Sequence, residues 1–105
     1  METLECKGIV RVMLPAVRAS VAEAMHSDFG YNQEEIAAKL GVVQVAVSKY
    51  LRGRYSKRIA SAKAYIAKHR LADSIVKGIA SGYSRQQTDK AIDELCERLV
   101  SYPAF

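Results

Sequence analysis

The stretch from Gln33 to Arg52 constrains the fold more than any other part of the chain, because it contains two short amphipathic segments in close succession. Ile36 and Leu40 are spaced four residues apart, so they lie on one face of a helix. Val47 and Leu51 have the same spacing in the second segment. The pattern predicts two short helices that pack on a common core.

The ends of these helices are marked by residues with known preferences. Gly41 follows the first apolar stripe, and a helix commonly ends on a left-handed residue, a conformation that costs glycine nothing. Asn32 and Glu35 have the spacing of a capping box at the start of the first helix. We therefore predict helices over residues 33–40 and 44–52, joined by a tight turn.

The side of the second helix that does not carry the apolar stripe is suited to DNA. Gln44 stands at its beginning, where a glutamine can pair with N6 and N7 of adenine in the major groove. Val43 and Val45 can contact thymine methyl groups, Ser48 can bind a base or a phosphate, and Lys49 supplies charge. The sequence thus predicts a helix-turn-helix with base contacts from Val43, Gln44, Val45, Ser48 and Lys49.

The segment resembles the helix-turn-helix of the Cro and lambda-repressor class, often called the xenobiotic-response-element family. The matching residues are Gln33, Ala37, Leu40, Gly41, Val42, Gln44 and Val47. The longer string formed by residues 13–18, 33–44 and 47–51 is similar to small archaeal predicted transcriptional regulators. The resemblance covers residues 5–58, and it implies that Gln33 contacts a phosphate and supports Gln44, which reads a base.

Val43 departs from the pattern of this class. Ser or Thr is common at this position, where the hydroxyl caps the second helix and contacts DNA. A valine supplies neither the cap nor a polar contact with DNA. The resemblance therefore implies that specificity depends more on Gln44 and on contacts with thymine methyl groups.

A basic block follows the second predicted helix. Seven Lys and Arg residues and no acid occur from Arg52 to Ala72, in a chain of net charge +5. Such a surplus favours an anionic partner. We predict phosphate contacts from Gln33, Arg52, Arg54, Tyr55, Lys57 and Arg58. A solvated helix face explains Lys63, Lys68 and Arg70 at least as well.

The rest of the chain also has helical signals. Apolar periodicity and capping residues predict helices over residues 3–13, 15–27, 57–81 and 84–100, the last of them opened by Ser84 and Gln87 with the spacing of a capping box. The alternative for the first two is one joined helix. Pro15 is expected to start or kink a helix, and the third of these helices has a candidate break near His69. Residues 28–31 are predicted to be a loop. Since no strand pattern occurs, the predicted fold class is all-α, a lambda-repressor-like bundle with additional C-terminal helices.

The length of 105 residues suits one domain. We expect a DNA-binding core over residues 15–58 and C-terminal helices over residues 59–105. Helix-turn-helix proteins usually bind paired half-sites, so we expect a homodimer on double-stranded DNA, with the C-terminal helices as a candidate interface. The alternative is that these helices complete the core of the monomer.

Other classes of protein have less support in the sequence. The chain has no apolar run long enough to span a membrane and no secretory leader, so we expect a cytoplasmic protein. Cys6, Cys96, His26 and His69 lack zinc-ligand spacing, so we expect no metal and no other cofactor. In a cytosol we expect reduced thiols, and the alternative is a disulfide between Cys6 and Cys96.

The motifs also bear on catalysis and on effectors. No phosphate loop or nucleophile motif indicates an enzyme. No residue pattern identifies a small-molecule effector. The alternative function is a helix-turn-helix used as a protein-interaction module, such as an antitoxin or a coactivator-like adaptor.

Overall fold

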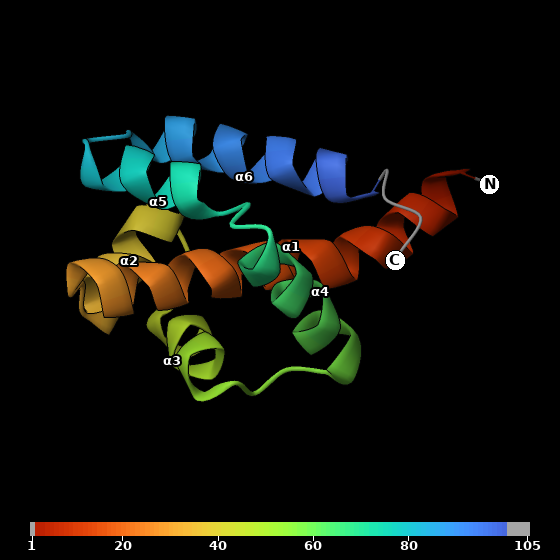
Figure 1. Ribbon diagram of the computed structural model, residues 1–105, viewed down its shortest axis with the longest axis horizontal. Helices are drawn as coiled ribbons and strands as arrows, with labels where there is room; N and C mark the ends of the chain where they lie inside the picture. Colours follow the sequence, from red (N-terminus) through yellow and green to blue (C-terminus); the bar gives the residue numbers. More distant parts are fainter. Residues whose placement is uncertain (1, 101–105) are drawn as a thin grey trace.

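The computed structural model describes the backbone of residues 2–100 and the side chains of residues 11–100. This part of the chain is built from helices alone, which confirms the predicted all-α class. The helices are α1 (Glu2–Phe29), α2 (Gln33–Leu40), α3 (Gln44–Arg52), α4 (Lys57–Lys68), α5 (Asp73–Ala80) and α6 (Arg85–Val100) (Figure 1). Among the helices described, none has both the length and the apolar character that crossing a bilayer requires.

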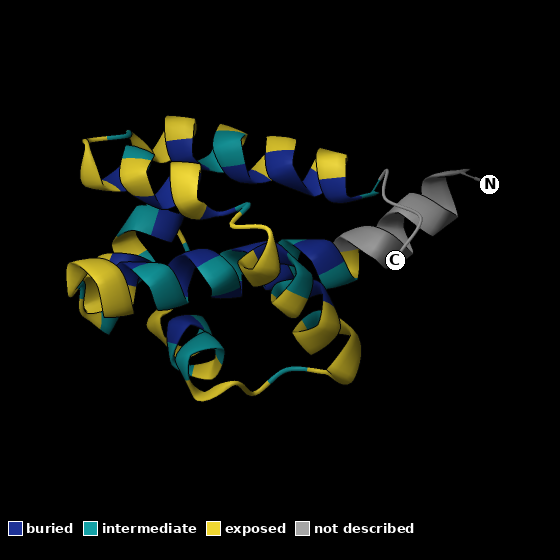
Figure 2. Cartoon of the chain, in the orientation of Figure 1, coloured by how far each residue is buried: buried dark blue, intermediate teal, exposed yellow. Residues whose placement is uncertain are grey.

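Helix α1 is the scaffold of the molecule, because each of the other five helices packs against it. In Figure 1, α5 and α6 run along one flank of α1, α3 lies on the other, and α4 rises from that second side and crosses α1. Helix α2 contacts α3 and α6 as well as α1, and thereby links the two flanks. One hydrophobic cluster joins all six helices, with members such as Val17, Ile36, Val47, Ile66, Ile79 and Leu95. Figure 2 shows these buried surfaces facing inward, toward the neighbouring helices.

Pro15 lies inside α1, so the alternative of one joined helix holds and the boundary predicted between residues 13 and 15 is wrong. Helix α1 continues through Pro15 and ends at Phe29, two residues beyond the predicted end. A proline inside a helix removes one hydrogen bond and costs about 3 kcal/mol. The neighbouring Met13 and Ala16 are buried in the core, so the packing of five helices against α1 offsets this local cost.

The segment predicted as one helix over residues 57–81 consists of α4 and α5, and the candidate break near His69 is confirmed. Arg70 has a φ of 54°, the left-handed conformation, although it is not glycine. The backbone N–H of Leu71 donates to the carbonyl of Ile66 at 3.0 Å and closes the end of α4. The change of direction lets Ile75 and Ile79 of α5 reach the core.

Helices α5 and α6 contribute to the monomer core. Ile92, Leu95 and Leu99 of α6 are buried in the hydrophobic cluster that includes α1. The predicted capping box at the start of α6 is present, since the Ser84 hydroxyl accepts from the N–H of Gln87 at 3.1 Å and the Gln87 side chain accepts from the N–H of Ser84 at 2.8 Å. Cys96 is a free, buried thiol.

Candidate nucleic-acid interface

The pair formed by α2 and α3 has the boundaries predicted from the sequence. The side chain of Asn32 accepts from the N–H of Glu35 at 2.8 Å, and the Glu35 carboxylate accepts from the N–H of Asn32 at 2.9 Å. Gly41 ends α2 with a φ of 66°, and the N–H of Val42 donates to the carbonyl of Ala37 at 3.1 Å. The capping box and the glycine turn are therefore confirmed.

Helix α3 begins without a side-chain cap. Val43 occupies the N-cap position in an extended conformation, and its side chain offers no acceptor to the first N–H groups. The other end of α3 is closed by Gly53, whose φ is 71° and whose N–H donates to the carbonyls of Lys49 and Tyr50. As predicted from the sequence, α3 lacks a hydroxyl cap at position 43.

The predicted base-contacting residues lie on the outer side of α3 and at its start. Val47 is fully buried, whereas Gln44 and Lys49 are exposed and Ser48 is half-buried. Val43 is 71% exposed and Val45 is 66% exposed, a large exposure for apolar side chains of this size. The structure therefore brings these residues to one end and one side of a single helix.

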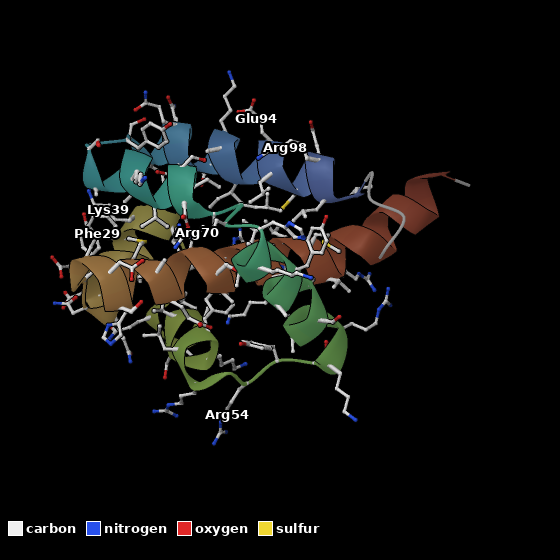
Figure 3. The ribbon with its side chains drawn as sticks, viewed as in Figure 1. Phe29, Lys39, Arg54, Arg70, Glu94 and Arg98 are labelled. Atoms are coloured by element: carbon white, nitrogen blue, oxygen red, sulfur yellow. The ribbon has the colours of Figure 1, made fainter. Side chains whose placement is uncertain are left out.

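The predicted phosphate-contacting residues follow α3 along the connection to α4. Arg52, Arg54, Lys57 and Arg58 are exposed, and Gln33 at the start of α2 is half-buried. Most of this connection is exposed in Figure 2, and Figure 3 shows Arg54 pointing away from the body of the molecule. The sequence contains no acid from Ile36 to Ala72, so no residue of this segment offsets its positive charge.

Tyr55 has a different environment from the other predicted phosphate contacts. Its ring is half-buried, and its hydroxyl donates to Oε2 of Glu23 in α1 at 3.4 Å. The Nζ of Lys63 in α4 lies 2.8 Å from Oε1 of the same carboxylate and 6.0 Å from the centroid of the Tyr55 ring. Glu23, Tyr55 and Lys63 therefore form a cluster that ties the connection after α3 to α1 and α4.

The charge of Lys63 is maintained by this cluster. Burial lowers the pKa of Lys63, but the hydrogen bond and the negative charge of Glu23, with smaller contributions from Tyr55, outweigh it and raise the pKa overall. Lys63 is thus an ion-pair partner of α1 and not part of a fully solvated face. Sequence reasoning did not find this cluster because Glu23 precedes Tyr55 by 32 residues and no local pattern relates them.

We expect replacement of Glu23 by alanine to destabilise the protein by about 1–2 kcal/mol, because Lys63 and the Tyr55 hydroxyl both lose their acceptor. Thermal unfolding followed by circular dichroism would measure the change. Glu94→Ala is the control, since Glu94 is an exposed glutamate on α6. Equal melting temperatures for the two variants would contradict the role of the cluster.

Comparison with known proteins does not assign the chain to a family. No family model matches the chain, and neither the curated proteins nor the solved structures contain a match. The fold defines an all-α protein. The candidate site within it is an exposed helix face, at α3, followed by a basic connection.

Proposed function

We propose that this protein is a sequence-specific regulator of transcription that binds double-stranded DNA. In this proposal α2 and α3 form a lambda-repressor-like helix-turn-helix, and α3 enters the major groove. The observation that carries the proposal is the two-sided character of α3, which buries Val47 and exposes Gln44, Val45 and Lys49. The basic connection that follows it is the second support.

The two groups of residues would have different tasks. Gln44 reads a base edge, with Val43, Val45, Ser48 and Lys49 as its neighbours. Gln33, Arg52, Arg54, Lys57 and Arg58 hold phosphates and fix the position of α3 in the groove. Tyr55 acts mainly through its bond to Glu23, which holds the basic connection against α1.

We expect Gln44→Ala to lose about 1–3 kcal/mol of affinity for the preferred sequence and to relax preference at one base position. Arg54→Ala should instead weaken binding to all sequences and reduce the dependence of affinity on salt by about 0.9 in log–log slope. Selection of bound duplexes from a random pool, followed by anisotropy titrations, would measure both effects. Base readout by Gln44 would be refuted by a uniform loss of affinity across sequences.

The proposed regulator acts as a homodimer in the cytoplasm. Proteins of this kind bind half-sites about one helical turn of DNA apart, so a two-fold symmetric protein matches a near-palindromic site. The same selection experiment tests this point, because the bound sequences would contain two inverted half-sites. Light scattering of the free protein and of the complex would give the number of subunits.

One observation also favours a second function, binding of another protein through α3. Val43 and Val45 are apolar and exposed, and such residues can enter a protein interface as readily as they can contact thymine methyl groups. A protein-interaction module, such as an antitoxin or a coactivator-like adaptor, would use the same face. The absence of duplex binding at low salt would favour this function over the first.

A further inference from the structure

A polar cavity of about 210 Å³ lies where α1, the turn between α2 and α3, and the beginning of α6 meet. Its lining residues belong to α1, to α6 and to the turn before α3, and the proposed DNA contacts do not use them. Four of its lining residues are charged, in contrast to the apolar core nearby. The cavity is lined by Arg18, Leu40, Gly41, Arg85, Asp89, Ile92 and Asp93.

The charges around this cavity are only partly paired. Nε of Arg85 lies 3.4 Å from Oδ2 of Asp89, so these two side chains neutralise one another. Among the residues whose side chains are described, no ion pair joins Arg18 or Asp93 to a partner of opposite charge. The Nε atom of Arg18 is shielded from solvent and has no hydrogen-bond partner. Leaving a charged donor buried and unsatisfied is costly, and Arg18 is also one of the residues that line the cavity.

Arg18 and Asp93 face the same region of the molecule. Burial is the main reason that the pKa of Cys96 is raised to about 11; the charge of Asp93 adds to the rise, whereas that of Arg18 opposes it. Both charges are therefore close enough to act on one buried thiol. They also line one cavity, yet they do not contact one another. The guanidinium of Arg18 and the carboxylate of Asp93 therefore line the same cavity without forming an ion pair.

We propose that this cavity binds a small zwitterion that carries a carboxylate and an ammonium group, as an α-amino acid does. The ligand carboxylate accepts hydrogen bonds from the guanidinium of Arg18, and its ammonium group donates to the carboxylate of Asp93. The volume equals about seven water molecules, which suits a ligand of this size.

The charges of the cavity disfavour simpler ligands. A plain anion would satisfy Arg18 but would be repelled by Asp93, and a metal cation would be repelled by Arg18. A zwitterion is the class that pairs both free charges at once.

The position of the cavity connects it with the turn before α3. Gly41 lacks a β-carbon, and a β-carbon there would collide with the guanidinium of Arg85, so the side chain of this α6 residue lies on the turn. An occupant would contact the turn through Leu40 and Gly41 and α6 through Asp93. Regulation of DNA binding by the ligand rests on the proposed function, but binding of the ligand does not.

The test is titration of the full chain, without DNA, with each standard amino acid at concentrations up to about 10 mM, followed by thermal shift and by NMR of backbone amides. We expect at least one amino acid to raise the melting temperature and to shift the amides of Gly41 and Asp93. Arg18→Gln and Asp93→Asn should each weaken that binding at least tenfold. Since Asp93 is exposed, its variant tests the site even if the Arg18 variant fails to fold.

The matched controls are Arg98→Gln and Glu94→Gln. Each removes one charge, positive or negative, from a part of α6 that lines a separate groove facing α5 (Figure 3). Both should bind the amino acid as the unaltered protein does. The proposal would be overturned if no amino acid bound, or if acetate bound as tightly and Asp93→Asn had no effect. Because this assay contains no DNA, its failure is distinguishable from a failure of the proposed regulator function.

Discussion

Replacement of Arg52 and Arg54 together by glutamate is expected to abolish measurable duplex binding at physiological salt. Both side chains are exposed beside Gly53, in a stretch that contains no acid. Each reversal removes one proposed phosphate contact and adds repulsion between the protein and the DNA backbone. Any residual binding at low salt should depend less on salt, with a log–log slope reduced by about 1.8, or about 0.9 for each phosphate that is no longer neutralised. Anisotropy titrations over a salt series would measure both quantities.

The matched control reverses Lys90 and Arg98 on α6. Each reversal removes two units of charge, so both double variants lower the net charge from +5 to +1 (5 − 4). The α6 variant should retain most of its affinity because it leaves the connection after α3 unchanged. Equal losses in the two variants would show that overall charge, and not this connection, is responsible for binding.

Replacement of Leu40 by alanine is expected to destabilise the protein by about 2–5 kcal/mol, because Leu40 is only 1% exposed and a cavity would remain in the core. Leu40 is the last residue of α2 and clusters with Ile36 and Val47. The substitution would therefore weaken the packing of α2 and α3 in the core. Against a typical total stability of about 5–15 kcal/mol, the loss is large.

Urea unfolding monitored by circular dichroism would measure this change. The control is Val45→Ala, which removes apolar atoms from a side chain that is 66% exposed and should change the stability by less than about 0.5 kcal/mol. A similar free energy of unfolding for the two variants would contradict the packing of α2 against the core.

The parts of the fold that the sequence predicted are those specified by neighbouring residues. Asn32 and Glu35 begin α2, Gly41 ends it, and Ser84 with Gln87 begins α6. Each of these signals acts over three or four residues, so one short segment contains all the information. The exposed face of α3 was predictable for the same reason, because helical periodicity alone separates it from the buried Val47.

The features that the sequence did not predict depend on contacts between distant segments. Pro15 is tolerated because five helices pack around α1. Tyr55 and Lys63 meet on Glu23, a residue of another helix that no local pattern connects with them. The cavity around Arg18 exists only where α1, the turn at Gly41 and α6 come together. In each case the determining partner lies in a segment that is distant in the sequence.

The central place of α1 also affects how the protein is made. A ribosome completes α1 at Phe29 but reaches the end of α6, which packs along it, only at Val100, 71 residues later (100 − 29). At about 5–20 residues per second, this interval lasts about 4–14 s. During that time the apolar stripe of α1, which includes Val17, Val21 and Met25, has no complete covering. The nascent chain is therefore an expected client for chaperones that bind exposed apolar helices during synthesis.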